Sequence, residues 1–457
     1  MQIKEGVPTP ILSRRSIYFV IAAVIGVCAL YLFDLTGMGM VSTDEPRYAA
    51  IGQAMAQSGD WITPRLWGSP WFEKPALLYW MTATTFKLGL GPDVAPRLPV
   101  ALLSVAFLAF FWWRLKIEWD ERVASCSTAL LATSAGWLAY SHVSITDLPL
   151  AAFFTAAVLL SFRRDLTAPA ACLALAVLAK GLVPLVLFLP VLPICWRRIR
   201  PVPVLVFVVI TLPWYILCAL RNPEFLRVFF VEHTFGRFSS GAMQHVQPWW
   251  FYLPVLLLLL FPWFPLLAFV RRSAWKDPRI QTLGAVVVFG FLFFSAAVNK
   301  LPGYLLPLLP AACLLIGFGL ANAPRSRFAM AAPLALMGTL PAVAQVVPGA
   351  LAHGLRTANI PWIELSLGLA IGLAVGMIGR PAFPAAATIA VIGFILFQIS
   401  LFPAIDQAAS ARPIWLQSHP ACVSRLPRSL VYGLNYYAGR SLPDCGVVDP
   451  NGTRVVR

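Results

Sequence analysis

Long apolar runs separated by short polar linkers dominate the chain from residue 16 to residue 402. Hydrophobic residues make up 59% of the 457 residues, whereas charged residues make up only 12%. A water-soluble fold of this length has too little interior to bury so much apolar surface. Most runs are long enough for a helix to cross a bilayer, so the sequence predicts an all-α polytopic membrane protein with about 13 transmembrane helices.

The predicted crossings divide the chain into a transmembrane domain, residues 1–402, and a short C-terminal segment, residues 403–457. They are residues 16–34, 98–113, 123–143, 148–162, 168–180, 182–196, 202–219, 248–270, 282–298, 304–321, 327–346, 362–379 and 382–402. The first run leads to no small-residue cleavage pattern, so it is interpreted as a membrane helix rather than a signal peptide. The run 76–90 contains Lys87 and is predicted to lie in the outer interface as an amphipathic juxtamembrane helix.

Basic clusters on alternate linkers set the predicted orientation. They are Arg114/Lys116/Arg122, Arg163/Arg164, Arg197/Arg198/Arg200, Arg271/Arg272/Lys276/Arg279, Arg325/Arg327 and Arg380. All fall on the side of Arg14 and Arg15, which the positive-inside rule makes cytoplasmic. The formal charge of +16 therefore indicates contacts with anionic membrane lipids. It does not indicate nucleic acid, because no basic run is interleaved with aromatic residues on a polar surface.

The remaining basic residues fall on the outer side, against that rule. They are Arg47, Arg65, Lys74, Lys87, Arg97, Lys180, Arg221, Arg227, Arg237 and Lys300, accompanied by Asp44, Glu45, Asp60, Glu73, Asp147, Glu232 and His233. Positive charge on this side needs an anionic partner. The set predicts a polar outer cavity for an anionic, phosphate-bearing ligand, with a first outer loop at residues 35–97 as its main part.

Chemistry assigns roles within this set. A phosphate leaving group is stabilised by cations in the transition state, so Arg47, Lys74, Arg237 and Lys300 are predicted to bind it, with Tyr304 as a neutral donor. An attacking hydroxyl needs a carboxylate base. Asp44 is the preferred candidate, and Asp147 and Glu73 are further catalytic candidates. Direct displacement at the carbon that bears the phosphate would invert the configuration of that carbon.

Each of these residues also has a structural interpretation. Asp44 and Asp147 each precede a predicted helix and are therefore candidate helix caps. Glu73 and Lys74 are also consistent with a surface ion pair, and Lys180 with snorkelling from a broken helix.

The sequence holds no pair or set of residues with the spacing of a zinc site. No cofactor is predicted to be required, and a divalent metal ion held by Glu73 and His233 is a secondary hypothesis. Cys422 and Cys445 are the two cysteines in the outer tail, where oxidising conditions favour a disulfide between them. The tail stretch 429–437 is predicted to begin as a strand.

Several motifs in register carry a resemblance to a known family. They are the run 44–80 (DEPRYAAIGQAMAQSGDWITPRLWGSPWFEKPALLYW), Ala95-Pro96-Arg97, Thr146-Asp147-Leu148-Pro149-Leu150, Ala179-Lys180-Gly181 and Asn299-Lys300-Leu301-Pro302-Gly303-Tyr304. Over residues 16–310 the chain resembles the C-type membrane glycosyltransferases, and among them the lipid A aminoarabinose transferases, relatives of the protein O-mannosyltransferases. The chain departs from that pattern in having Trp71-Phe72 before Glu73-Lys74-Pro75 and a shorter C-terminal segment.

The resemblance implies a bacterial inner-membrane enzyme whose active site and C-terminus are periplasmic. It implies transfer of a sugar from a polyprenyl (undecaprenyl) monophosphate to lipid A or another cell-envelope glycan. Two alternatives stay open at this point. One is a protein O-mannosyltransferase-like enzyme, and the other is a lipid-linked sugar transporter or flippase, which predicts charges near mid-membrane and similarity between two halves.

Overall fold

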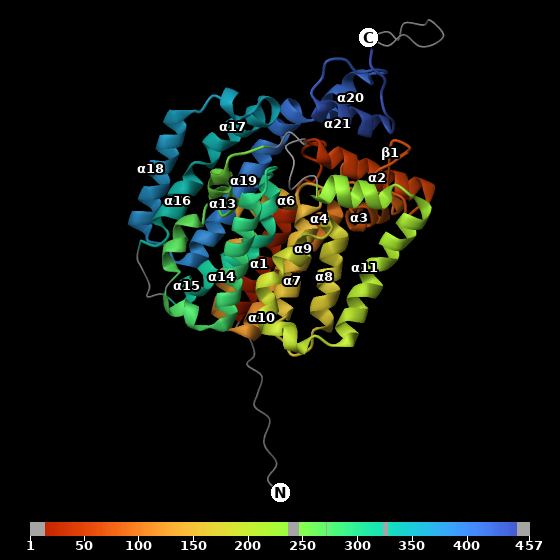
Figure 1. The fold of residues 1–457 in the computed structure, drawn as a ribbon. Coiled ribbons are helices and arrows are strands. Elements are labelled where there is room, and N and C mark those ends of the chain that lie inside the picture. Colours follow the sequence, from red (N-terminus) through yellow and green to blue (C-terminus); the bar gives the residue numbers. More distant parts are fainter. Residues whose placement is uncertain (1–13, 236–245, 271, 323–327, 446–457) are drawn as a thin grey trace, which may run out of the picture.

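The computed structural model describes residues 14–235, 246–270, 272–322 and 328–445, and in these parts it is nearly all α-helical (Figure 1). One two-stranded antiparallel hairpin, β1 (Arg65–Leu66) and β2 (Ser69–Pro70), stands outside the helical pattern. The predicted helical class is therefore confirmed.

Within the described residues, six helices are long and apolar enough to cross a membrane. They are α4 (Leu98–Glu118), α11 (Pro201–Arg221), α14 (Pro278–Ala296), the continuous stretch η8–α15 (Pro302–Asn322), α18 (Trp362–Gly379) and α19 (Phe383–Ala409). A seventh follows if α16 (Ala331–Gly338) and α17 (Leu340–His353), which meet at 51°, form one bent span. The predicted count of about 13 transmembrane helices is not confirmed.

The other predicted crossings are short or broken. α1 (Arg14–Leu32) is long, but several of its side chains lie outside the described residues. α7 (Asp147–Leu160) and α8 (Thr167–Lys180) have 14 residues each. The run 123–143 divides into α5 (Glu121–Ala132) and α6 (Ala135–Ser141). The run 182–196 divides into α9 (Val183–Leu187), η1 (Leu189–Val191), α10 (Leu192–Cys195) and η2 (Trp196–Arg198). The run 248–270 divides into η5 (Trp249–Phe251), α13 (Tyr252–Leu259) and η6 (Phe264–Phe269).

Proline explains two of these breaks. The run 182–196 contains Pro184, Pro190 and Pro193, and the run 248–270 is interrupted at Pro262 and Pro265. A proline removes a backbone N–H donor and clashes with the preceding helical turn. A prediction from apolar composition alone treats each of these runs as one helix, because it does not take the prolines into account.

One end of the helical bundle carries a polar layer. There lie α2 (Asp44–Ser58), α3 (Leu77–Lys87), the hairpin, α20 (Arg412–Ser418) and α21 (Arg428–Ala438), whereas α10 lies at the opposite end (Figure 1). α3 confirms a helix in the run 76–90. It packs closely on α2, because a Cβ at Gly52 would lie only 1.9 Å from Oγ1 of Thr82.

The C-terminal segment is built differently from the prediction. α19 continues past residue 402 to Ala409, and the stretch expected to begin as a strand is the helix α21. The predicted disulfide is present between Cys422 and Cys445, whose Cα atoms lie 5.1 Å apart. It closes the chain around α21.

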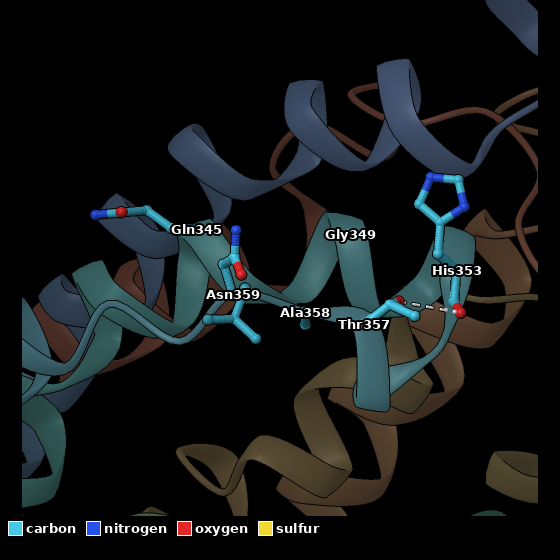
Figure 2. Close-up of a pocket in the computed structure, with 7 residues that line it drawn as sticks. Gln345, Gly349, His353, Thr357, Ala358 and Asn359 are labelled. Carbon is cyan, nitrogen blue, oxygen red and sulfur yellow. Dashed lines mark hydrogen bonds between the residues drawn. The ribbon is translucent and has the colours of Figure 1, made fainter.

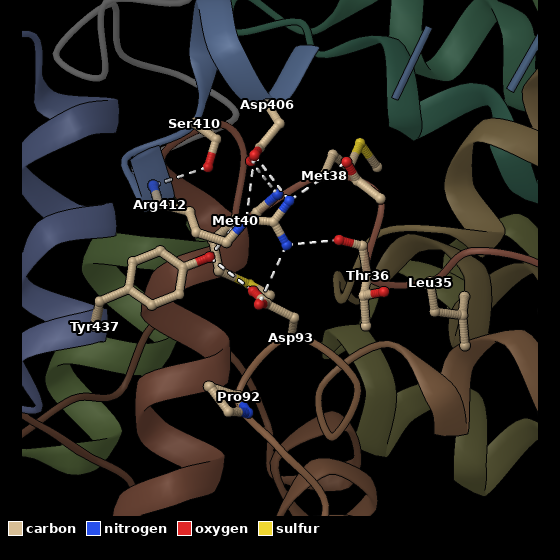
Figure 3. A network of polar contacts seen from close by, with 12 residues as sticks. Leu35, Thr36, Met38, Met40, Pro92, Asp93, Asp406, Ser410, Arg412 and Tyr437 are labelled. Atoms are coloured by element: carbon tan, nitrogen blue, oxygen red, sulfur yellow. Dashed lines mark hydrogen bonds and ion pairs between the residues drawn. The ribbon is translucent and has the colours of Figure 1, made fainter. Parts of the chain in front are cut away.

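A polar network fastens this segment to the first outer loop (Figure 3). Arg412 forms ion pairs with Asp406 at 2.8 Å and with Asp93 at 3.3 Å. The hydroxyl of Tyr437 donates to Asp93 at 2.8 Å and accepts from the backbone N–H of Met40 at 3.0 Å. The C-terminal segment therefore helps to position the loop that leads into α2.

The disulfide generates the first prediction. In unfolded, unreduced protein we expect an alkylating reagent to modify the six free cysteines, and all eight only after reduction. Mass spectrometry of the tail peptides measures this directly. A loop of this length should stabilise the segment by about 3 kcal/mol in the chain-entropy model. Alkylated Cys422 and Cys445 without reductant would contradict the pairing.

Candidate active site

A fully buried ion pair stands at the base of the first outer loop. Nε of Arg97 donates to Oε1 of Glu45 at 2.7 Å, and Nη2 donates to Oε2 at 2.9 Å. Glu45 also accepts from the backbone N–H groups of Val41 at 2.9 Å and Ser144 at 3.0 Å, while Arg97 donates to the carbonyl of Gly39 at 2.8 Å. Both charged groups are thus paired with each other and hydrogen-bonded to the backbone, so Glu45 holds the start of α2 in place.

The neighbouring acid, Asp44, belongs to a second group of charges. Arg47, one turn further along α2, bonds to Asp44 and donates to Oε2 of Glu73 at 2.8 Å. The other oxygen of Glu73 pairs with Nζ of Lys74 at 3.4 Å. We call Asp44, Arg47, Glu73 and Lys74 the charged cluster; its acids and cations alternate.

Exposure distinguishes the members of the charged cluster. The side chain of Asp44 is 35% exposed, whereas those of Arg47, Glu73 and Lys74 are exposed by 10% or less. Asp44 does not cap its helix, because the N-cap position is Thr43 and no side-chain capping bond is present there. Asp44 is therefore the acid that can meet a ligand, while Glu73 is enclosed between two cations.

Burial and charge act in opposite directions on Arg47. Burial alone lowers the pKa of a guanidinium, but the carboxylates of Glu73 and Asp44 outweigh that effect and raise the pKa of Arg47 above its ordinary value. Arg47 therefore stays cationic at every working pH.

A second meeting point joins three of the motifs that lie far apart in the sequence. Oδ1 of Asp147 accepts from Nζ of Lys180 at 2.5 Å, and that ammonium lies 4.9 Å from the ring centroid of Tyr304. A Cβ at Gly303 would lie 2.4 Å from Oδ1 of Asp147, so a larger residue at this position would displace the carboxylate. The capping interpretation of Asp147 fails because Thr146 takes the N-cap position.

Lys300 is buried and directed at the backbone. Its Nζ donates to the carbonyls of Ala297 at 2.5 Å and Gln247 at 3.1 Å. These bonds fix the loop that precedes Tyr304. A direct phosphate contact by Lys300 stays a prediction.

Two predicted site residues are not placed. Arg237 lies outside the described residues, and so does the side chain of His233, whose backbone belongs to η3 (Arg227–Phe235). Across the described part of the chain, no three His, Cys, Asp or Glu side chains lie close enough together to hold a metal ion. The hypothesis of a metal held by Glu73 and His233 thus stays untested.

Aromatic side chains enclose Arg47, and the sequence analysis missed them. The guanidinium carbon lies 5.4 Å from the ring centroid of Tyr432, 5.5 Å from that of Trp71 and 5.9 Å from that of Tyr48. Tyr432 comes from α21, almost four hundred residues further along the chain, and no local motif announces it. Cation–π contacts of this kind stabilise a partly desolvated guanidinium.

Two cavities open on the described surface. One, of about 440 Å³, is lined by Trp71 and Phe72, by residues 221–224 and by Val228, and it therefore adjoins the aromatic enclosure of Arg47. The other, of about 420 Å³, lies between the end of α17 and the following loop, with Gln345, His353 and Asn359 on its wall (Figure 2). None of the predicted site residues lines this second cavity.

The fold and the charged end of the bundle define a multi-pass membrane protein of the C-type glycosyltransferase fold. Its structure resembles that of ArnT from Cupriavidus metallidurans bound to undecaprenyl phosphate, with a TM-score of 0.74 and 24% identity over 95% of this chain and 86% of the other. It also resembles the arabinosyltransferase EmbB from Mycobacterium smegmatis, with a TM-score of 0.52 and 14% identity over 98% and 45% of the chains. These likenesses establish the fold.

The chain belongs to the dolichyl-phosphate-mannose-protein mannosyltransferase family, whose profile matches residues 16–275. It is 33% identical over 63% of its length to the undecaprenyl phosphate-alpha-4-amino-4-deoxy-L-arabinose arabinosyl transferase of Photorhabdus laumondii subsp. laumondii. It is 32% identical over 72% of its length to the protein of the same name from Pseudomonas paraeruginosa. The matches span 57% and 63% of those relatives' own lengths.

The buried ion pair generates the second prediction. Arg97→Ala leaves the charge of Glu45 buried without its partner, so the protein should lose about 3 to 5 kcal/mol of stability. Thermal unfolding in detergent measures the loss. The matched control is Arg221→Ala, since Arg221 is exposed and pairs with Asp60 at 3.2 Å on the surface. Such surface pairs contribute about 0 to 1 kcal/mol. Equal unfolding temperatures for the two variants would contradict the role given to Arg97.

Proposed function

We propose that this chain is a glycosyltransferase that moves a sugar from a polyprenyl (undecaprenyl) monophosphate to lipid A or another cell-envelope glycan. The observation that carries the proposal is the charged cluster, in which a partly exposed carboxylate lies beside two enclosed cations at one end of a membrane bundle. The relatives' names and the undecaprenyl phosphate in the ArnT structure support the same donor class.

The proposed donor contact is Lys74. When the sugar leaves, negative charge grows on the lipid phosphate, and a cation held in a water-poor site stabilises that charge strongly. Lys74 holds Glu73 at 3.4 Å, a longer contact than the 2.8 Å of Arg47 to the same carboxylate. A bound phosphate can therefore draw Lys74 away from Glu73 at a smaller loss of ion-pair energy than it could draw Arg47 away. Arg47 meanwhile keeps Glu73 and Asp44 in position.

Asp44 is the proposed base and faces the acceptor. Its side chain is the exposed acid of the charged cluster, whereas the carboxylate of Asp147 is clamped by Lys180 at 2.5 Å. In a direct displacement the acceptor oxygen bonds to the anomeric carbon as the phosphate oxygen leaves with the bonding pair. The proton of a hydroxyl acceptor passes to Asp44.

The alternatives differ in acceptor and in process. A protein hydroxyl acceptor would correspond to the name of the matching family. A lipid A acceptor corresponds to the lipid A aminoarabinose transferases, which the sequence motifs resemble. A transporter needs charges near the middle of the membrane. The charged cluster lies instead on α2 and the adjoining loop, in the polar layer at the bundle's end (Figure 1). That position favours a transferase.

Sidedness is part of the proposal. η2 carries Arg197 and Arg198 and lies directly after α10, at the end of the bundle opposite α2 and α21 (Figure 1). By the positive-inside rule this basic end faces the cytoplasm. The N-terminus would then be cytoplasmic, and the site and C-terminus periplasmic, in a bacterial inner membrane.

The third prediction tests the activity through Lys74. Full-length protein should add an aminoarabinose to lipid A when given the undecaprenyl-phosphate donor, and mass spectrometry detects the product. Lys74→Ala should reduce this rate roughly ten- to hundredfold, because a charge-assisted contact contributes about 1.5 to 3 kcal/mol. The control is Lys87→Ala, an exposed lysine at the end of α3. Wild-type rates in Lys74→Ala would remove it from the donor site, and no product from the wild type would rule out aminoarabinose and lipid A as the donor sugar and acceptor.

The fourth prediction concerns the acceptor class. A phosphomonoester loses its second proton near pH 6 and is the stronger nucleophile afterwards. With a phosphate acceptor, the wild-type rate should therefore rise about fivefold from pH 5 to pH 6, reach about tenfold by pH 7 and level off above that. An alcohol does not ionise in this range. A rate that lacks this rise would point to a hydroxyl acceptor.

A further inference from the structure

Arg428, at the start of α21, is an exposed cation with a fixed orientation. Its Nη2 donates to the hydroxyl of Tyr432 at 2.8 Å and its Nε to the same oxygen at 3.3 Å. The guanidinium has five N–H groups, so this contact leaves the Nη1 side of the fork for another acceptor. Among the ion pairs of the described residues, none involves Arg428.

Tyr432 connects this cation to the charged cluster. The guanidinium carbons of Arg428 and Arg47 lie 5.3 and 5.4 Å from the centroid of the same Tyr432 ring. The charge of Arg47 is offset by Asp44 and Glu73, whereas no carboxylate among the described residues forms an ion pair with the exposed Arg428. A second cation beside the first raises the electrostatic potential at the mouth of the site, and that potential favours an anion.

The hairpin turn packs against the same Tyr432 ring. Trp67 lies 5.5 Å from Tyr432, centroid to centroid, and its φ of 49° places it in the left-handed region that non-glycine residues seldom adopt. Its indole N–H is buried, and within the described structure it has no hydrogen-bond partner. A buried donor of this kind needs an acceptor. The turn therefore holds an unsatisfied donor against the ring that fixes Arg428.

We propose that Arg428, held by Tyr432, forms an anion subsite on the C-terminal segment that receives a phosphate group of the acceptor. The subsite rests on the proposed function and adds to it the part of the chain that selects the acceptor. A guanidinium fork matches phosphate oxygens in geometry and charge. The donor phosphate is assigned to the enclosed Lys74, so the exposed Arg428 serves the partner that arrives from outside.

Three ligands separate the sources of such an anion. Full-length protein in detergent is titrated with phosphorylated lipid A, with dephosphorylated lipid A and with phosphatidylglycerol, and binding is measured directly. The variants are Arg428→Ala, Arg428→Lys and Tyr432→Phe. The control is Arg440→Ala, because Arg440 is an exposed arginine just past the other end of the same helix.

Arg428→Ala should weaken binding of phosphorylated lipid A about three- to tenfold. The expected effect is smaller than for a buried contact because solvent screens a charge at an exposed site. Arg428→Lys should recover part of this loss, and Tyr432→Phe should show a smaller loss because the cation is less well oriented. Binding of dephosphorylated lipid A should not change, and neither should the Arg440→Ala control. In transfer assays with Arg428→Ala, KM for the acceptor should rise while kcat and KM for the donor stay constant.

The outcomes separate this subsite from the enzyme proposal. Equal binding of phosphorylated lipid A by wild type and Arg428→Ala would overturn the subsite even if transfer occurs. An equal effect on phosphatidylglycerol would overturn the assignment to the acceptor and identify a lipid headgroup contact. If binding depends on Arg428 and phosphate but no sugar is transferred, the subsite stands and the proposed reaction fails.

Discussion

The buried pair of Glu45 and Arg97 is the constraint on which the outer end of the molecule depends. Two charges removed from water are tolerated only when they are paired and their remaining donors and acceptors are satisfied. Here the backbone at Val41, Gly39 and Ser144 satisfies them, so two separate segments, one at residues 39–41 and one at Ser144, are fixed relative to the start of α2. The adjacent Asp44 is thereby held at the surface of a rigid helix. Two neighbouring acids thus have different tasks.

The C-terminal segment completes this arrangement from the opposite end of the sequence. Arg412 and Tyr437 fasten it to the first outer loop through Asp93, and Tyr432 covers Arg47. Arg47 is thus held by carboxylates on one side and by aromatic rings on the other. The C-terminal segment therefore contributes Tyr432 to the surroundings of Arg47 in the candidate site.

Site residues in local motifs could be predicted from the sequence, whereas contacts between residues far apart in the sequence could not. Asp44, Glu73 and Lys74 stood out because charge is unusual beside apolar runs, and the structure brings them together around Arg47. The contact of Lys180 with Asp147 was missed, since a lysine that ends a helix is also explained by snorkelling. Tyr432 carried no signal, because its contact joins residues almost four hundred positions apart. The number of crossings stays a prediction, since hydropathy does not register where proline interrupts a helix, and six or seven helices of the described residues are long and apolar enough to span.

The division of labour between Asp44 and Glu45 is the central claim, and one paired measurement tests it. Asp44→Asn and Glu45→Gln are isosteric changes at adjacent positions, and each purified variant is assayed for single-turnover sugar transfer and for thermal unfolding. The account predicts that Asp44→Asn unfolds like the wild type but transfers more slowly, by about a hundredfold or more with a hydroxyl acceptor and by less with an ionised phosphate. Glu45→Gln should unfold at a clearly lower temperature. A stable Glu45→Gln protein, or an Asp44→Asn protein with full activity towards every acceptor and at every pH, would contradict it.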